Sequence, residues 1–376
     1  MTNDQTPMTN ERGPAPDAEV FLPHLIAWEV TRSCPLACKH CRAAARNRPY
    51  EGELSTAEGR RLLEHIADFA RPTIILTGGE PMLRPDLYDL AAHARGLGLP
   101  VVLAPCGQMV DDAAVARMKD AGIHAISLSI DGADAASHDA FRGVPGAFDM
   151  VLRAAEAARR GDLAFQINTT VTQANRDALP AIRDLAVRLG AAVFNPFLLV
   201  PTGRGADLAG QELSAADYER TLAWLADQDR TGPIRIRVTC APHYARVQAQ
   251  RAARADVWPG RLVRPGETGP AEEVAPFSRG CMGGKTFAFI SHTGIVQICG
   301  FLDEPAGDLR QADLDFARIW RDSPLLKAVR DVDAYHGRCG VCEYRFICGG
   351  CRARAFAFTG DVLAEEPFCV YRPRGA

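Results

Sequence analysis

Residues 31–41 read TRSCPLACKHC and place Cys34, Cys38 and Cys41 at the CxxxCxxC spacing. Gaps of three and two residues let one loop donate three thiolates to a 4Fe-4S cluster, so that one iron stays open to a small molecule. The segment directly follows an apolar run. The sequence therefore predicts a strand that leads into a cluster-binding loop.

Two simpler interpretations of these cysteines are buried thiols and a zinc knuckle. Zinc normally takes four ligands, and no fourth ligand follows at a usual spacing. His40 stands between two of the cysteines, where we expect it to pack near an adenine ring rather than to bind a metal. The spacing therefore favours an iron–sulfur cluster.

Composition excludes several classes of protein. The chain has 376 residues and a net charge of -3, which offers no basic surface for nucleic acid and no polybasic membrane anchor. No apolar run approaches the ~20 residues that span a bilayer. Residues 1–23 lack the basic and apolar regions of a secretory signal and are predicted to be a disordered leader. We therefore expect a cytoplasmic protein.

Twelve cysteines are many for a cytoplasmic protein, because disulfides are rare in that compartment. Three lie within residues 34–41 and seven within residues 281–369, while Cys106 and Cys240 stand alone. Clustered cysteines in a reducing compartment indicate metal or redox chemistry. Cys106 follows a predicted strand and is expected to be a small buried hydrophobe.

From residue 24 the chain alternates short apolar runs with stretches of helical spacing. This alternation predicts an α/β fold, a partial (β/α)6 barrel similar to a TIM barrel, with its chemistry at the carboxyl ends of the strands. The predicted strands are Leu25–Val30, Thr73–Leu76, Val101–Ala104, Ala125–Ile130, Ala164–Thr170 and Ala192–Leu198. The predicted helices are Thr56–Phe69, Leu87–Leu97, Asp111–Ala121, Ala147–Arg160 and Ala178–Leu189.

After the leader, composition divides the chain into a barrel, a bridge and a cysteine-dense module. The bridge has helical spacing at Ala215–Asp229 and Ala245–Ala253 and then a Pro/Gly/Glu-rich stretch at Pro259–Ala275. The module is turn-rich, which predicts a small unit held together by metal rather than by its own core. The expected boundaries are 24–205 for the barrel, 206–275 for the bridge and 276–376 for the module.

Residues 77–81 read TGGEP and follow the second predicted strand. Together with the cysteine loop, this segment resembles the radical S-adenosylmethionine (SAM) superfamily, whose GGEP motif holds the amino group of SAM. Gly78 and Gly79 let the backbone approach closely, and Glu80 supplies an acceptor for an ammonium group. The alternative is an ordinary strand-to-helix turn. The resemblance implies that the loop cysteines carry a catalytic cluster at which SAM is cleaved to a 5′-deoxyadenosyl radical.

Other residues near strand ends are SAM contacts if the resemblance holds. Ser129 and Asp131 alternate onto one face at the end of the fourth strand and would contact the ribose and carboxylate of SAM, although the Asp-Gly pair is also a common turn. Asn168 is a second ribose candidate. Arg142 would reach the methionine carboxylate, or it is a solvated surface arginine. Leu199 would pack on adenine, or it is part of the core.

The second cysteine array contains two CxxC pairs with only five residues between them, which is short for a zinc site and leaves three cysteines over. The array resembles the SPASM domain, an auxiliary-cluster module of radical SAM enzymes, except that two residues rather than three separate its last close pair. If only one cluster binds, part of the array is structural thiol or zinc. The resemblance implies one cluster on Cys339, Cys342, Cys348 and Cys369, and a second, with an open iron, on Cys281, Cys299 and Cys351.

The bridge contains three further candidates, Cys240, His243 and Tyr244, in the segment VTCAPHY. They would line a substrate cavity if the bridge covers the mouth of the barrel. The alternative is an ordinary proline turn with a satisfied histidine.

Several longer segments together resemble the SAM-dependent heme b synthases of the siroheme-dependent pathway. The resemblance implies oxidative decarboxylation of two propionates of iron-coproporphyrin III to vinyl groups, with a low-potential electron donor such as ferredoxin or flavodoxin. A substrate with four propionates needs cationic partners, for which Arg142, Arg204, Arg352 and Arg354 are candidates. The segments are HCRAAA (40–45), FRGVPGAFD (141–149), NTTVT (168–172), LVPTGRG (199–205), TCAPHY (239–244) and CGGCRARA (348–355).

Three other functions stay open. A SPASM maturase would use the same clusters on a ribosomally made peptide, and another radical SAM enzyme of a heme pathway would act on a related tetrapyrrole. An iron–sulfur electron carrier or a zinc protein would not be an enzyme. Such a protein would need neither the GGEP segment nor a six-stranded barrel, so the sequence favours an enzyme.

Overall fold

Ten strands form one sheet in the computed structural model, which describes residues 21–254 and 280–374. The strands lie in the order β10-β9-β8-β1-β2-β3-β4-β5-β6-β7, parallel from β8 to β7 and antiparallel at β9 and β10. They are β1 (Leu25–Thr31), β2 (Thr73–Gly78), β3 (Val101–Leu103), β4 (Ile123–Ser129), β5 (Ala164–Val171), β6 (Val193–Leu198), β7 (Arg235–Ile236), β8 (Phe287–Ile290), β9 (Ile295–Gln297) and β10 (Gly307–Asp308).

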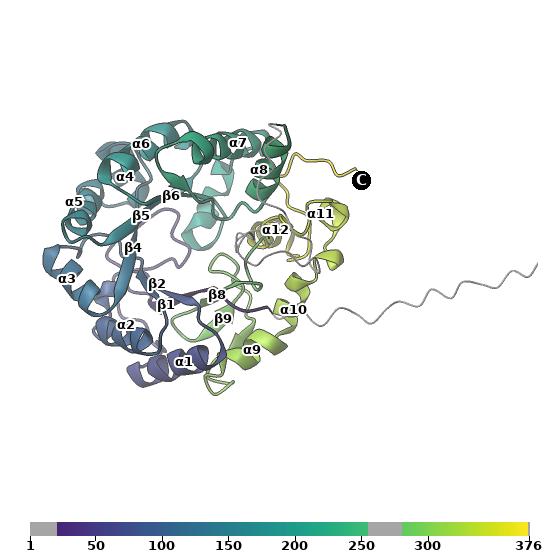
Figure 1. Ribbon diagram of the computed structural model, residues 1–376. Coiled ribbons are helices and arrows are strands. Elements are labelled where there is room, and N and C mark those ends of the chain that lie inside the picture. The colour runs from purple at the N-terminus through teal and green to yellow at the C-terminus, as the bar shows by residue number, and fades with distance from the viewer. Residues whose placement is uncertain (1–20, 255–279, 375–376) are drawn as a thin grey trace, which may run out of the picture.

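Helices surround this sheet, with α1 to α7 around the strands and α9 to α12 gathered on the side of β8 and β9 (Figure 1). Within the described residues, no helix combines the length and the apolar character that a membrane crossing requires. The α-helices are α1 (Thr56–Phe69), α2 (Leu87–Gly96), α3 (Asp112–Asp120), α4 (Ala135–Arg142), α5 (Ala147–Arg160), α6 (Leu179–Leu189), α7 (Ala215–Thr231), α8 (His243–Arg254), α9 (Phe316–Asp322), α10 (Pro324–Arg330), α11 (Gly337–Val341) and α12 (Arg352–Thr359). Short 3-10 helices are η1 (Pro81–Leu83), η2 (Arg176–Ala178), η3 (Gly203–Gln211) and η4 (Val332–Ala334).

The six predicted strands are confirmed as β1 to β6, and the predicted helices are confirmed as α1, α2, α3, α5, α6, α7 and α8. Local chemistry explains this success. In α1, Ser55 and Glu58 form a capping box, and Leu62 and Ile66 lie on the buried face. Sequence analysis missed α4, because its only buried residue is His138 and it has no apolar stripe. Its signals are the capping Asp134 and a glycine after its last residue.

The sheet is larger than the predicted six-stranded barrel. β7 has two residues, too few to show a periodic pattern, and β8 comes from the cysteine-dense module. β8 pairs in parallel with β1, with Leu25 opposite Phe287, so the module contributes a strand to the barrel sheet. The boundary expected at residue 276, the stretch at Pro259–Ala275 and residues 1–20 of the expected leader lie outside the described residues.

The carboxylate of Glu29, on β1, is fully buried and joins the barrel to the module. Its oxygens lie 2.7 Å from Arg32 Nε, 3.0 Å from Arg42 Nη1 and 3.1 Å from His292 Nδ1. Burial alone would raise its pKa, but Arg42, His292 and Arg32 lower the pKa from 4.5 to about 2. His292 follows β8 and Arg42 belongs to the loop after β1, so this ion cluster connects segments that are distant in the chain.

We expect Glu29→Gln to lower the free energy of unfolding by about 3 kcal/mol, because it leaves Arg32 and Arg42 without their buried counter-charge. Urea unfolding of the anaerobically prepared protein at pH 7 measures this change. The control is Asp313→Asn, which removes an exposed ion pair with Arg61 and is expected to cost less than about 0.5 kcal/mol. Equal losses in the two variants would contradict the role of Glu29.

Candidate active site

The cysteine loop lies directly after β1 and is partly enclosed. Cys34 and Cys38 are buried, Cys41 is half-buried, and all three are free thiols. They pack with Leu36 and with small residues of the same loop. Burial, together with the neighbouring Cys38, raises the pKa of Cys34 to about 12. The thiol would therefore have to lose its proton to become a ligand of iron, and this role of Cys34 stays a prediction.

The GGEP segment holds this loop by direct backbone contact. The amide nitrogen of Gly79 donates to the carbonyl of Thr31 at 2.9 Å, and that of Glu80 donates to the carbonyl of Ser33 at 2.7 Å. A Cβ at Gly79 would lie 2.3 Å from the carbonyl oxygen of Ser33, and one at Gly78 would lie 2.1 Å from that of Thr31. Side chains are therefore excluded at both positions, as the sequence predicts from the close approach of two backbones.

The PTGRG segment holds the other side of the loop. Arg204 donates to the carbonyl of Cys38 through Nε at 2.8 Å and to that of Ala45 through Nη1 at 2.6 Å. Its amide nitrogen donates to the carbonyl of Cys41 at 3.0 Å. Gly203 has a φ of 59°, and a Cβ there would lie 2.1 Å from the carbonyl oxygen of Arg42. Arg204, a candidate for binding propionate, therefore supports the cysteine loop.

Arg142 and Asp131 form a buried pair beside the loop. Arg142 Nη2 lies 2.6 Å from an Asp131 oxygen, and Arg142 Nη1 lies 3.7 Å from the sulfur of Cys38. The amide of Thr170 donates to Asp131 at 2.7 Å. Burial would raise the pKa of Asp131, but Arg142 lowers it overall. In this structure Asp131 positions Arg142, and a direct contact of Asp131 with SAM stays a prediction.

Polar atoms without partners indicate what the loop is built to receive. Among the described residues, His40 Nδ1, Arg142 Nε and Arg204 Nη2 are buried and make no hydrogen bond. The ring of His40 stacks on Phe141 at 4.6 Å, and burial lowers the pKa of His40 to about 4. Three thiols beside unpaired guanidinium nitrogens fit an iron–sulfur cluster with an anionic ligand such as the methionine carboxylate of SAM.

Glu80 is fully buried within this site. Its carboxylate accepts from the amide of Met82 at 2.8 Å and from the amide of Cys106 at 2.5 Å. Burial raises the pKa of Glu80 in spite of these contacts. Cys106, which the sequence treats as a simple buried residue, therefore belongs to the support of the GGEP segment. Binding of the SAM amino group by Glu80 stays a prediction.

A row of polar side chains crosses β5 and β6 and reaches the segment after β7. Asn168 Oδ1 accepts from Gln166 at 2.9 Å and from Asn195 at 3.3 Å, and Thr239 donates to Asn195 at 3.0 Å. Ser129 is half-buried and pairs with Asn168 in the sheet register. Sequence analysis singled out only Asn168 and Ser129. The signal for the others is a polar residue within an otherwise apolar strand.

Leu199, the expected adenine contact, is buried just after β6. Its carbonyl accepts from Arg354 at 2.8 Å, and its amide donates to the carbonyl of Val171 at 3.3 Å. The structure thus brings Leu199 to the same edge of the sheet as the cysteine loop, where packing on adenine stays a prediction.

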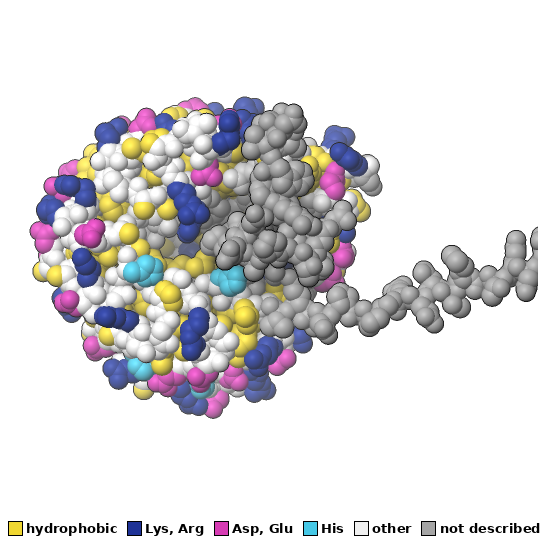
Figure 2. Space-filling model, viewed as in Figure 1, with side chains coloured by type: hydrophobic (Ala, Val, Ile, Leu, Met, Phe, Trp, Pro, Cys, Tyr) yellow, Lys and Arg dark blue, Asp and Glu magenta, His cyan; other side chains and the backbone are white. Residues whose placement is uncertain are grey.

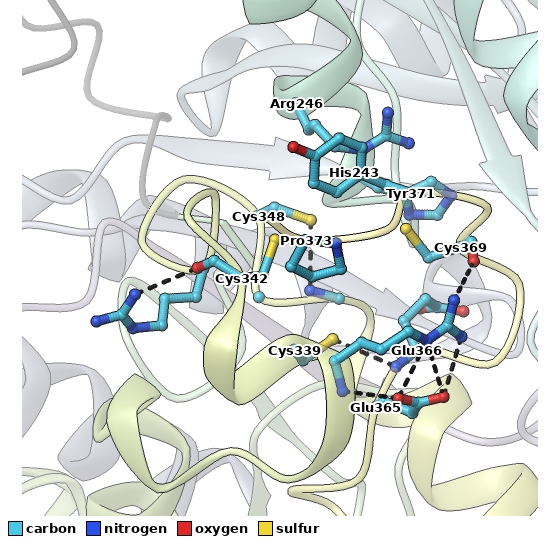
Figure 3. A pocket seen from close by; sticks show the side chains of 14 residues that line it. His243, Arg246, Cys339, Cys342, Cys348, Glu365, Glu366, Cys369, Tyr371 and Pro373 are labelled. Carbon is cyan, nitrogen blue, oxygen red and sulfur yellow. Dashed lines mark hydrogen bonds and ion pairs between the residues drawn. The ribbon is translucent and has the colours of Figure 1, made fainter. Parts of the chain in front are cut away.

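Four cysteines of the second array, Cys339, Cys342, Cys348 and Cys369, form an outer thiol group. They line one pocket (Figure 3). Arg246 lies on the wall of this pocket and is nearly fully buried against Glu219. The pocket has the four thiols that a closed 4Fe-4S cluster requires.

The other three cysteines, Cys281, Cys299 and Cys351, form an inner thiol group. Cys351 belongs to the hydrophobic core and Cys299 packs against that core, while burial and the neighbouring Cys281 and Cys351 thiols raise the pKa of Cys299. The inner and outer groups adjoin, because the amide of Cys281 donates to the carbonyl of Cys348 at 3.1 Å. Glu366 also links them, since it accepts from the amide of Cys351 at 2.7 Å and its own amide lies 3.4 Å from the sulfur of Cys339.

A zinc site requires several ligands that converge on one ion. Within the two described ranges, no three His, Cys, Asp or Glu side chains are arranged to hold a single metal ion. Thiolates that bind different irons of a cubane stand further apart than ligands of one ion. Thiols are the ligands that iron–sulfur clusters use, and binding of clusters by these three groups stays a prediction.

The bridge candidates lie against the auxiliary thiols and the core. Cys240 adjoins Cys351, His243 lines the outer pocket with both ring nitrogens unpaired, and Tyr244 packs against the hydrophobic core. Burial, together with nearby arginines, lowers the pKa of His243 to about 3. A role for these residues in substrate binding stays a prediction.

Two of the four arginines proposed for substrate binding are fully buried. Arg352 donates to the carbonyls of Val362 and Ala364 at 3.0 and 2.7 Å. Arg354 donates to the carbonyls of Leu198 and Leu199 and lies against Glu366. Both side chains are 0% exposed, so they hold the module together and do not face a substrate.

We expect Gly79→Ala to release the GGEP segment from the cysteine loop, because its Cβ overlaps two backbone carbonyls. Iron content after anaerobic reconstitution should fall by about four atoms per chain, the content of one cluster, and formation of 5′-deoxyadenosine should stop. Gly96→Ala is the matched control, since a Cβ there meets nothing within 4 Å. Full iron content and SAM cleavage in Gly79→Ala would rule out this role for the contact.

The sequence matches the radical SAM superfamily over residues 28–186. It is 49% identical over 350 residues to the AdoMet-dependent heme synthase of Nitratidesulfovibrio vulgaris, covering 93% of this chain and 93% of that one. It is 42% identical over 351 residues to the AdoMet-dependent heme synthase of Methanosarcina barkeri, covering 93% of this chain and 97% of that one.

Among solved structures, the fold is similar to that of Streptococcus suis SuiB bound to precursor peptide SuiA. The TM-score is 0.72 at 17% identity, covering 94% of this chain and 77% of that one, so the likeness is one of fold alone. Sequence identity over nearly the whole chain decides the closer relationship. The chain belongs to the radical SAM superfamily and, within it, to the family of AdoMet-dependent heme synthases.

Proposed function

We propose that this protein is a radical SAM heme synthase that oxidatively decarboxylates two propionates of iron-coproporphyrin III to vinyl groups and so forms heme b. The observation that carries the proposal is the similarity to AdoMet-dependent heme synthases along nearly the entire chain. The three groups of free thiols support it, because the reaction needs both a radical and an electron acceptor.

The residues of the barrel would bind and orient SAM at the loop cluster. Cys34, Cys38 and Cys41 would hold that cluster, which together with SAM would supply a radical able to take hydrogen from the β-carbon of a propionate. The unpaired nitrogen of Arg142 is available to the SAM carboxylate, and His40 offers a neutral ring near the adenine. Asp131 holds Arg142 in place. The polar row around Asn168 offers hydrogen-bond partners for the ribose.

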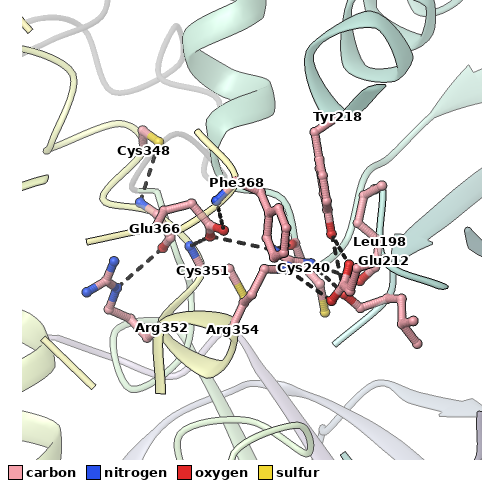
Figure 4. Close-up of polar contacts among 12 residues, drawn as sticks. Leu198, Glu212, Tyr218, Cys240, Cys348, Cys351, Arg352, Arg354, Glu366 and Phe368 are labelled. Atoms are coloured by element: carbon pink, nitrogen blue, oxygen red, sulfur yellow. Dashed lines mark hydrogen bonds and ion pairs between the residues drawn. The ribbon is translucent and has the colours of Figure 1, made fainter. Parts of the chain in front are cut away.

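The auxiliary module would take up electrons. Each conversion of a propionate radical to a vinyl group releases carbon dioxide and one electron, so an acceptor must lie near the substrate. The inner thiol group adjoins the end of β6 through Arg354, and the outer group lies next to the inner one through Glu366 (Figure 4). The proposal therefore assigns the two groups to auxiliary clusters.

The substrate would enter from the open face of the barrel. Figure 2 shows a hollow near the centre of this face, with basic side chains and histidines on its rim. Such a rim suits a substrate with several carboxylates. The proposal also includes a low-potential donor such as ferredoxin or flavodoxin and a cytoplasmic location, which the free state of all twelve cysteines supports.

Incubation of the reconstituted protein with SAM, a strong reductant and iron-coproporphyrin III under anaerobic conditions tests the proposal. We expect heme b in the chromatogram, with about two molecules of 5′-deoxyadenosine per heme. SAM cleavage without any vinyl product would exclude iron-coproporphyrin III as the substrate and would leave the superfamily assignment unchanged. In that case a maturase acting on a peptide becomes the next function to test. Bound zinc without labile sulfide would remove the catalytic proposal.

We expect Cys299→Ala to separate SAM cleavage from heme formation, because it damages the inner group and leaves the loop cluster intact. Formation of 5′-deoxyadenosine should stay within about twofold of the unsubstituted protein, while formation of heme b should fall by about tenfold or more. Both products are measured in one reaction, so SAM cleavage is the internal control. Parallel loss of both products, or no loss of heme, would contradict a separate electron-accepting role.

A further inference from the structure

Cys240 is the cysteine of the bridge that the seven-cysteine array leaves out. It follows Thr239, which pairs with Phe197 beside the end of β6. Its backbone φ is 61°, in the left-handed region that few residues other than glycine adopt, and Arg354 donates to its carbonyl oxygen at 2.9 Å. Tertiary contacts therefore hold Cys240 in a conformation that the chain does not prefer by itself.

The Cys240 side chain lies near that of Cys351, one member of the inner thiol group (Figure 4). Cys240 and Cys299 both pack against the core that contains Cys351, and the neighbouring Cys351 thiol, burial and the Cys299 thiol raise the pKa of Cys240. Cys281 in turn lies next to Cys351 and Cys299. Four thiols from separate segments of the chain therefore meet in one place, and none of them is in a disulfide.

Four thiols are the ligand set of a closed 4Fe-4S cluster. We infer that Cys240 is the fourth ligand of the auxiliary cluster held by Cys281, Cys299 and Cys351, so that this cluster has no open iron. On ligation each thiol releases its proton to solvent and its sulfur bonds to one iron. The inference rests on the auxiliary clusters of the proposed function and is independent of the substrate.

A closed inner cluster restricts what the module does. Without an open iron it binds no substrate carboxylate, and its role is confined to electron transfer. Cys240 reaches the inner group only when the bridge packs against the end of β6 and the start of α12. Binding of the cluster therefore stabilises the joined arrangement of barrel, bridge and module.

The test uses the full-length chain with Cys34, Cys38 and Cys41 replaced by Ala, because the open iron of the loop cluster is then absent. This background, its Cys240→Ala variant and its Cys106→Ala variant are reconstituted anaerobically and reduced. Iron is counted, and EPR-detected hyperfine coupling to 13C-cyanide reports an open iron. Cys106→Ala is the matched control, since Cys106 lies beside Glu80 in the barrel.

We expect about eight irons per chain and no 13C coupling in the background and in Cys106→Ala. Cys240→Ala should keep this iron and gain a 13C coupling. If it instead loses about four irons, ethanethiol is expected to restore them by filling the vacated ligand position. Coupling already present in the background, an unchanged Cys240→Ala variant or a failed restoration overturns the inference. Fewer than about four irons per chain in the background would contradict the auxiliary clusters of the proposed function and, with them, the inference.

Discussion

The buried guanidinium of Arg354 holds the barrel, the bridge and the module in one arrangement. It donates to the carbonyls of Leu198 and Leu199 at the end of β6 and to that of Cys240 in the bridge. Within the module it lies 3.4 Å from the carboxylate of Glu366. A buried charge without its partners is strongly destabilising, so these segments stay together as long as Arg354 lies inside. The positions of both auxiliary thiol groups relative to the barrel depend on this contact.

The function follows from that arrangement. Parallel strands bring the cysteine loop, the GGEP segment and the polar row of β5 and β6 to one edge of the sheet. The inner thiol group lies beside the same edge, and the outer group lies next to it. Under the proposed function, an electron released at the barrel mouth has adjacent acceptors, and the radical stays enclosed by the barrel. A fold that separated these groups would leave the electron without a nearby acceptor.

Sequence analysis succeeded where the physical signal is local. Periodicity and capping predict the six strands and most helices. The parallel topology predicts that the site lies at the carboxyl ends of the strands. It failed for α4, which has no apolar stripe, and for β8, whose partner is more than two hundred residues away. It also offered Arg204 and Arg354 as substrate contacts, whereas both side chains are used to hold backbone carbonyls. A charged residue next to a sequence motif does not reveal in which direction its side chain points.

The sequence by itself indicated the chemistry of the first ligand group, because the spacing of Cys34, Cys38 and Cys41 lies within one loop and needs no distant contact. In the same way it determined the barrel class and the family. Only the tertiary structure decided which groups meet. Cys240 lies near Cys351, more than one hundred residues away in the chain, because Arg354 and the end of β6 hold the bridge there. Such convergence depends on long-range packing, for which a pattern along the chain has no signal.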